Sequence, residues 1–289
     1  MPDQETGSQH EPQRLRVVYS RGEALRFISH QDEFRMWERA LRRTMLPVAY
    51  KQGFNPQPHI QFAAPLAVGC CGRAEHMDFR LSERMPVVQV ESRLGAKLPP
   101  GVSICSMQEI PVKSRPLQGL LIGADYRIRV MAPETATGPQ AVHEFLARGT
   151  VWRKRERKGH PYRYNLKPLV HHLAWTGFDA AGPCHNLLLR VQMVAGATGR
   201  PDEVVDELGL SEHALVLERT RLYFANEPDT DVAFPPDTLA SQADVRDPHE
   251  PPRPPRRQRG RGHRRKQKGD VQPQQKVQSF SDKAADEFR

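Results

Sequence analysis

The sequence predicts an α+β protein in which two units of strands and helices follow one another and a basic tail ends the chain. Two periodicities support this fold class. Several short segments alternate apolar and polar residues, as half-buried strands do, and others repeat apolar residues every three or four positions, as amphipathic helices do. Past residue 226 both patterns disappear. A chain of 289 residues is long enough for two ordinary domains and a tail.

The first unit is expected over residues 13–112, after a polar segment, residues 1–12, that we expect to be disordered. Its elements follow the order strand, helix, strand, strand, helix, strand, with the strands near residues 14–19, 60–66, 76–81 and 102–110. This order is the split βαβ arrangement of ferredoxin-like domains, in which two helices cover one face of an antiparallel sheet. The other face stays free, and RNA-binding domains of this architecture often hold an RNA strand there.

The helix predicted to begin near His30 has the clearest local signals. Ser29 is expected to cap it by accepting the backbone amide of Asp32, whose carboxylate faces the positive end of the helix. An apolar stripe must pack against the sheet: Phe34, Trp37, Leu41 and Met45. Four arginines share a different arc, about 100° wide, and are candidates for RNA phosphates: Arg35, Arg39, Arg42 and Arg43. The alternative is an ordinary solvated helix face.

The loop at residues 51–59 combines a permissive glycine with stiffening prolines. Its motif residues are Gly53, Phe54, Asn55, Pro56 and Pro58, of which Phe54 and Asn55 are candidates for RNA contact. His59 ends the loop, and with His30 and Asp32 it forms the set of candidate catalytic residues, because histidine titrates near neutral pH. The alternative is that His30 caps or packs and that His59 is a strand-edge residue.

The second unit is expected over residues 113–226 as another ferredoxin-like α+β unit. Its strands are expected near residues 126–130, 187–194 and 215–224, and its helices near 139–147 and 201–208. A basic and aromatic hairpin between them is a further RNA candidate, through Arg153, Lys154, Arg155 and Arg157 beside Trp152, Tyr162 and Tyr164. The alternative is an edge hairpin whose charges discourage aggregation.

The net charge of +9 is unevenly distributed. Residues 227–252 carry one basic and seven acidic side chains, and we expect them to form an acidic linker. The tail, residues 253–289, is expected to be disordered, and its first part, residues 253–268, carries nine basic and no acidic side chains. Because the two units are also basic, polyanions are the expected partners.

No segment resembles a secretory signal or a membrane span, so we expect a cytoplasmic protein without membrane partners. The cysteines, Cys70, Cys71, Cys105 and Cys184, form neither a disulfide framework nor a zinc pattern. Cys70 and Cys71 are expected on the rim of a glycine-rich turn as incidental, half-buried residues. We therefore expect no metal and no cofactor.

Several short motifs occur together in this chain: Phe27-Ile28-Ser29-His30-Gln31-Asp32, Arg39-Ala40-Leu41-Arg42-Arg43, Gly53-Phe54-Asn55-Pro56-Gln57-Pro58, Pro65-Leu66 with Gly69, and Glu75. On these motifs the chain resembles the bacterial radical SAM-linked protein family, a domain found alone or fused behind a cobalamin-type radical S-adenosylmethionine protein. The resemblance covers about residues 14–226 and extends to Asn165-Leu166-Lys167-Pro168 and Glu218-Arg219-Thr220-Arg221-Leu222-Tyr223. The family usually has Ser at the position of Lys51, and often Asp and Arg at those of Asn165 and Lys167.

The family's gene surroundings imply work on RNA or the ribosome. The leading hypothesis is an RNA-binding accessory protein that acts with a radical S-adenosylmethionine enzyme, or in rRNA or tRNA modification or ribosome maturation. A second hypothesis is a metal-independent RNA-processing or RNA-modifying enzyme that uses His30 and His59. A third is a protein-docking scaffold for a radical enzyme, with Phe54 as the exposed anchor. Catalysis by this chain alone is the less favoured expectation.

Overall fold

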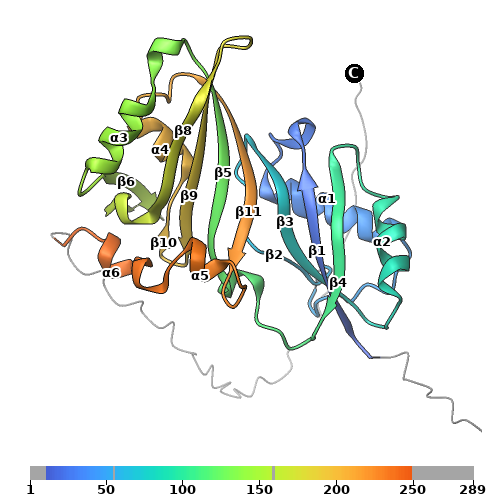
Figure 1. Cartoon of the computed structure of the whole chain (residues 1–289). Coiled ribbons are helices and arrows are strands. Elements are labelled where there is room, and N and C mark those ends of the chain that lie inside the picture. Colours follow the sequence, from blue (N-terminus) through green and yellow to red (C-terminus); the bar gives the residue numbers. More distant parts are fainter. Residues whose placement is uncertain (1–10, 55, 158–159, 249–289) are drawn as a thin grey trace, which may run out of the picture. The chain divides into compact units, whose positions relative to one another are not determined.

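The computed structural model describes residues 11–54, 56–157 and 160–248. The chain divides into one compact body, Met1–Glu250, and a C-terminal segment, Pro251–Arg289. The predicted disordered tail and most of the predicted disordered N-terminus lie outside the described residues. The predicted α+β class is confirmed, because a mainly antiparallel sheet is combined with several helices (Figure 1).

The first ferredoxin-like unit has the predicted order of elements. They are β1 (Gln13–Arg21), α1 (His30–Arg43), β2 (Ile60–Phe62), β3 (Cys70–Leu81), α2 (Val87–Gly95) and β4 (Val102–Ile110). In the sheet the strands lie in the order β2-β3-β1-β4, and each neighbouring pair is antiparallel. The first strand therefore sits between the third and fourth, as the split βαβ arrangement requires.

The second unit repeats this topology with insertions. Its elements are β5 (Leu121–Met131), α3 (Pro139–Ala147), β6 (Trp152–Arg157), β7 (His160–Asn165), β8 (Val170–Asp179), β9 (Cys184–Val194), β10 (Ala197–Thr198), α4 (Pro201–Glu207) and β11 (Ala214–Phe224). The main strands lie in the order β8-β9-β5-β11, while β6 and β7 pair only with each other as an inserted hairpin. The sequence patterns predicted the hairpin, but not β8.

The last strand of the second unit joins the two sheets. Residues 217–219 of β11 pair in parallel with residues 70–72 of β3, so nine strands of the described residues form one sheet. Figure 1 shows β11 and β3 side by side at this junction. The two ferredoxin-like units therefore belong to one compact body.

Each unit has an apolar core between its helices and one face of the sheet. In the first unit Trp37 and Leu41 of α1 pack with β1 and β3, so these two members of the predicted stripe are buried. Met45 is 86% exposed, contrary to the prediction. The reason is that α1 ends at Arg43 and Met45 adopts a left-handed conformation with φ of 55°, which turns the chain away from the helix.

A buried ion pair crosses the junction between the units. Two nitrogens of Arg219, on β11, contact the Glu75 carboxylate on β3 at 2.9 and 2.5 Å, and both side chains are nearly inaccessible to solvent. The guanidinium also donates to the carbonyls of Ala64 and Pro65. Thus the motif residue Glu75 and the motif around Arg219 meet in space, although 144 residues separate them.

The predicted acidic linker, residues 227–252, is folded in its described part. Phe234 is 1% exposed and packs on Gly123, where a Cβ atom would lie 2.0 Å from the ring. Ala240 exchanges two backbone hydrogen bonds with the buried side chain of Gln192. The short helices α5 (Thr230–Ala233) and α6 (Gln242–Val245) belong to this segment. The acidic composition and the loss of periodicity predicted a linker because isolated apolar anchors such as Phe234 produce no periodic pattern.

Cys70 and Cys71 are the first two residues of strand β3 and directly follow the turn that contains Gly69, as expected. Both are buried, at 1% and 5% exposure, whereas Cys105 on β4 is exposed. Burial raises the pKa of the Cys70 thiol to about 12, with a smaller contribution from Glu75, although the Arg219 charge acts in the opposite direction. The free thiolate is therefore scarce at Cys70.

Replacing Arg219 by Ala is expected to destabilise the protein by about 3–5 kcal/mol, because the Glu75 carboxylate is then buried without its partner. Urea unfolding followed by circular dichroism measures the change. Arg221→Ala is the matched control on the same strand; its ion pair with Asp229 is exposed, so its loss is expected to cost under about 1 kcal/mol. Equal, small effects of the two variants would contradict the structural role of the buried pair.

The thiols are expected to differ in reactivity toward Ellman's reagent at about pH 8. Cys105 reacts first in the native protein, since its thiol is exposed, while Cys70 and Cys71 react slowly, since they are buried and their pKa values are raised by burial. All thiols react in denaturant. Cys105→Ser removes the fast phase; a fast phase that survives in this variant would refute the assignment.

Candidate nucleic-acid interface

The start of helix α1 has the cap that the sequence predicts. The Ser29 hydroxyl accepts the backbone N–H of Asp32 at 3.2 Å and donates to the Asp32 carboxylate at 2.7 Å. These hydrogen bonds, with a smaller contribution from Arg35, hold the pKa of Asp32 below its ordinary value. Ser29 and Asp32 thus fix where the helix begins, and Asp32 is not among the residues that line the neighbouring pocket.

His30 and His59 line one pocket of about 460 Å³, together with Phe34 of α1 and residues of β1, β2 and β3. The His30 ring meets the edge of Phe62, with ring centroids 5.2 Å apart. Its Nδ1 is buried and has no hydrogen-bond partner among the described residues. Because this nitrogen is also inaccessible to solvent, a ligand in the pocket would reach it only after a local rearrangement.

Cations outnumber carboxylates around this pocket. Arg14, Lys51 and Arg80 line it, and Asp78 is the carboxylate among the described lining residues. Asp78 alternates with the core residues Met77 and Phe79, and it is buried because it pairs with both Arg14 at 2.6 Å and Arg16 at 2.9 Å. Partial burial first, then the charges of Arg80 and Lys51, lower the pKa of His59. The pocket therefore favours an anionic ligand.

The motif loop beside the pocket exposes its aromatic residue. Phe54 is fully exposed, next to Gly53, whose φ of 155° is one that L residues rarely adopt. Pro56 is exposed, whereas Pro58 is buried and its backbone bridges to Tyr50. The predicted contact residue Asn55 lies outside the described residues. Glycine and proline thus have structural roles here, and Phe54 is the side chain left free for a partner.

The four arginines of the predicted basic arc are all exposed on α1. Arg42 pairs with Glu38 at 2.9 Å, Arg35 lies 3.4 Å from Asp32, and Arg43 donates to the Lys97 carbonyl. Arg39 donates to a backbone carbonyl of its own helix and has no carboxylate partner among the described residues. The arc therefore retains positive charge, with Arg39 and Arg43 the least neutralised members, since neither has a carboxylate partner among the described residues.

The basic hairpin is largely occupied by the protein itself. Arg155 makes two hydrogen bonds to Glu203, at 2.7 and 2.9 Å, and stacks on the buried Tyr164 ring. Arg153 pairs with both Asp206 and Glu207 of α4. Lys154 is exposed, and Arg157 ends strand β6. The arginines of this hairpin thus clamp it to α4, and the interpretation of Arg153 and Arg155 as RNA contacts loses its support.

Other site chemistry is sparse in the described part of the chain. No group of three or more His, Cys, Asp and Glu side chains is placed there to hold a metal ion. The helices described are all too short or too polar to cross a bilayer. Lys51, Arg80 and Arg14 line the pocket but were not among the candidates from the sequence. Arg14 and Arg80 lie on strands, where the sequence pattern indicates only an ordinary exposed basic residue.

Comparisons with known proteins give a family and a distant structural likeness. A chain in a solved structure entitled "Crystal Structure of a Cbf5-Nop10-Gar1 Complex" is similar at 12% identity, with a TM-score of 0.39, over 76% of this chain and 51% of that chain. This chain thus spans about half the length of that one. No curated protein matches the sequence. A family model described as "Uncharacterized protein conserved in bacteria (DUF2344)" matches residues 14–201, and the chain belongs to this family.

Proposed function

We propose that this protein binds RNA in the cytoplasm through the His30–His59 pocket and the adjoining arginines of α1. The observation that carries the proposal is the excess of positive charge at the pocket. Its one described carboxylate, Asp78, is shared between Arg14 and Arg16, which leaves Lys51 and Arg80 without a carboxylate partner among the described residues. Phosphate groups fit such a site, and the two histidines offer hydrogen bonds to a base or sugar.

Helix α1 extends the same positive surface. His30 and Phe34 of α1 line the pocket, and Arg35 and Arg39 occupy the exposed side of the same helix. Exposed guanidinium groups suit phosphates because each offers up to five N–H donors in a planar fork. In this proposal α1 positions the RNA backbone and the pocket contacts one nucleotide.

The proposal includes a role as an accessory protein. The motifs that resemble the radical SAM-linked family support a radical S-adenosylmethionine enzyme as partner, with rRNA or tRNA as the bound RNA. Phe54 suits the docking of such a partner, because it is fully exposed in a loop that glycine and proline restrict, so fixing it in a contact costs little entropy. In this proposal the protein holds RNA at the His30–His59 pocket and α1, and it presents that RNA to an enzyme docked at Phe54.

The triple variant Arg35→Gln, Arg39→Gln and Lys51→Gln is expected to weaken RNA binding at low salt. It removes up to three phosphate contacts, so the slope of log affinity against log salt becomes shallower by about two, at ~0.7 for each single-stranded contact. Filter binding of total bacterial RNA across a salt series measures both quantities.

The matched control is the double variant Arg84→Gln and Arg93→Gln, which removes exposed arginines beside and on α2. This control is expected to leave affinity and slope nearly unchanged. If control and triple variant lower the affinity alike, RNA binding is a nonspecific effect of net charge. If wild-type protein binds no RNA at low salt, the proposal fails.

A second candidate function, acid–base catalysis on RNA, is favoured by one observation: His30 and His59 line the same pocket. The pKa of His59 lies below its ordinary value of 6.5, so His59 is neutral at pH 7 and suits a general base. A base must be deprotonated to act. The part of the pH profile that depends on this base is therefore expected to fall as the pH drops through the lowered pKa of His59.

His59→Ala is expected to abolish turnover of bacterial tRNA or rRNA, followed by gel electrophoresis and mass spectrometry of nucleosides, while RNA affinity falls by less than about threefold. His30→Ala tests the acid in the same way. His143→Ala, on α3 of the second unit, is the control. Turnover retained in both pocket variants, or absent in the wild type, would exclude this candidate.

A further inference from the structure

A second pocket lies on the open face of the sheet, the face opposite helices α1, α2, α3 and α4. On β5, Tyr126, Ile128 and Val130 enter the core, so the alternate residues Arg127 and Arg129 face the other way. The pocket has a volume of about 710 Å³ and is lined by strands of both units. It sits where β11 joins β3. Neither the RNA-binding candidates nor the His30–His59 pocket include its residues.

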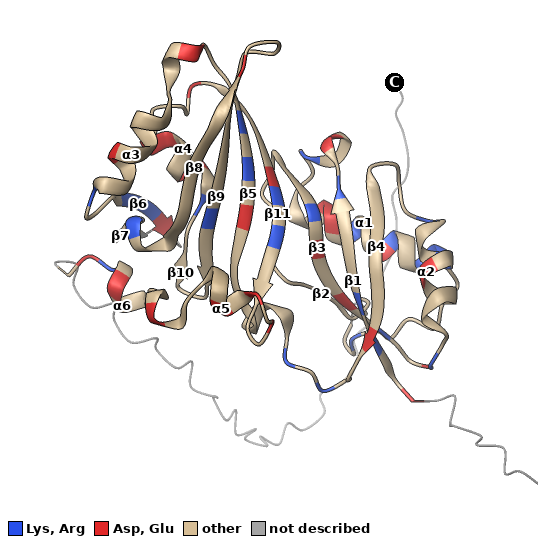
Figure 2. Ribbon diagram, viewed as in Figure 1, with Lys and Arg blue, Asp and Glu red and all other residues tan. Residues whose placement is uncertain are grey.

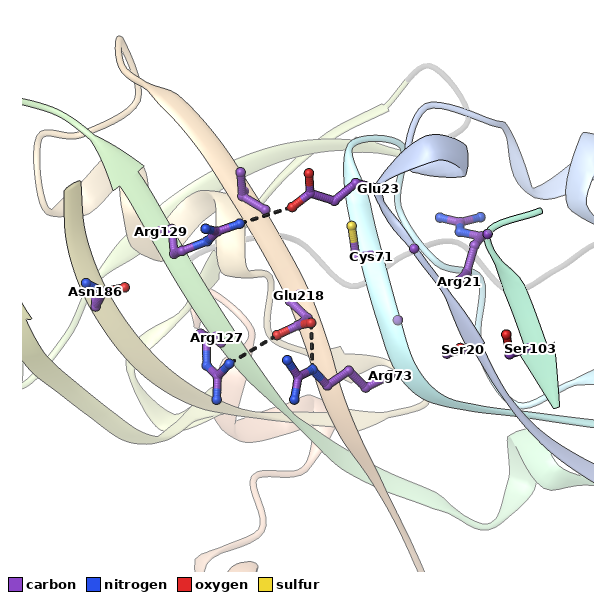
Figure 3. Close-up of a pocket in the computed structure, with 14 residues that line it drawn as sticks. Ser20, Arg21, Glu23, Cys71, Arg73, Ser103, Arg127, Arg129, Asn186 and Glu218 are labelled. Carbon is purple, nitrogen blue, oxygen red and sulfur yellow. Dashed lines mark hydrogen bonds and ion pairs between the residues drawn. The ribbon is translucent and has the colours of Figure 1, made fainter. Parts of the chain in front are cut away.

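Three arginines from two units converge in this pocket (Figure 3). Arg73 of β3 donates through Nε to Glu218 at 2.7 Å, and Arg127 of β5 lies 3.6 Å from the other oxygen of the same carboxylate. Arg129 pairs with Glu23 at 3.0 Å. One carboxylate thus holds two guanidinium groups close together, and the three arginines face two carboxylates.

Most donors of these arginines remain free. A guanidinium has five N–H groups. Among the described residues Arg73 uses one of them, Arg129 uses one, and Arg127 makes an ion pair without a hydrogen bond. The three side chains are between 43% and 59% exposed, so an incoming ligand reaches them without displacing the fold.

Figure 2 shows that basic residues recur on the neighbouring strands β5, β11, β3 and β1. Aromatic side chains, by contrast, are absent from the described residues that line the pocket. Small polar groups, including Ser20, Ser103 and Asn186, lie beside the arginines instead. Base stacking therefore has no platform here, whereas phosphate oxygens have guanidinium and hydroxyl donors.

We infer that this open-face pocket binds phosphate groups, with Arg73, Arg127 and Arg129 as ligands. The Glu218 carboxylate competes with a phosphate for Arg73 and Arg127, because arginine donates the same pair of hydrogen bonds to a carboxylate and to a phosphate. Glu218 thereby limits affinity for anions. The inference does not rest on RNA binding at α1, because it uses other residues on another face.

Two variants are expected to change phosphate affinity in opposite directions. Arg127→Gln removes a donor and is expected to weaken phosphate binding about tenfold. Glu218→Gln keeps the shape of the side chain but removes the competing charge, so it is expected to strengthen binding by about threefold or more. A purely structural role of this ion-pair cluster predicts no gain from Glu218→Gln. Arg93→Gln, on α2, is the control and is expected to change nothing.

The probes are inorganic pyrophosphate, measured by calorimetry at low salt, and uridine and adenosine RNA oligomers, measured by filter binding. All measurements are repeated in the Arg35→Gln, Arg39→Gln, Lys51→Gln background, so loss of RNA binding at α1 does not hide this pocket. Binding of pyrophosphate with the expected variant pattern identifies a site for small phosphates. The same pattern with RNA only, and equal affinity for the two oligomers, identifies a site for the RNA backbone.

Two results would overturn the inference. One is the absence of binding by every probe to the wild type and to Glu218→Gln. The other is binding that neither Arg127→Gln nor Glu218→Gln alters. Thermal unfolding of both variants checks that they fold; Arg127 and Glu218 are both partly exposed, so little loss is expected.

Discussion

The buried contact between Arg219 and Glu75 is the interaction on which the rest of the structure depends. Burying two charges is costly unless further hydrogen bonds accompany the pair, and here the carbonyls of Ala64 and Pro65 supply them. These carbonyls belong to the segment after β2, whose residues Ala63, Ala64 and Leu66 pack in the core of the second unit. The pair therefore holds β3, β11 and this segment in one arrangement, and the open-face pocket exists only because β11 lies against β3.

A second buried pair positions helix α1. Arg21 donates to the Glu33 carboxylate at 3.0 Å, and the Tyr19 hydroxyl donates to it at 2.8 Å, in a fully buried setting. Burial raises the pKa of Glu33, while Arg21 and then Tyr19 act in the opposite direction. Burial likewise raises the pKa of Tyr19, so its hydroxyl keeps the proton it donates. Because Glu33 is in the first turn of α1, this network fixes the turn that carries His30 into its pocket.

The sequence was informative where neighbours in the chain decide the structure. The Ser29 cap, the burial of Trp37 and the bounds of α3 follow from local pattern, and the alternation of strands predicts two ferredoxin-like units. Partners distant in sequence were not predictable. Arg153 and Arg155 meet α4 about 50 residues later, so their neutralisation leaves no local signal. Strand β8 was not predicted because two register shifts interrupt the alternation of its apolar and polar residues. For the site, the sequence suggested His30 and His59 together. Arg14 and Arg80 could not be predicted as their neighbours, because only strand pairing in the sheet places them at the same pocket.

Pairing, more than net charge, decides which basic residues are available to a polyanion. The +9 charge of the chain suggests basic surfaces everywhere, yet Arg21, Arg155 and Arg219 are each held by a carboxylate inside the fold. In the described part of the chain, cations outnumber carboxylates at two pockets of different chemistry. One has histidines and an exposed phenylalanine nearby, which suit base and partner contacts; the other has arginines without aromatic rings, which suit phosphates alone. The RNA that we propose as the ligand carries both bases and phosphates, the groups that these two surfaces suit.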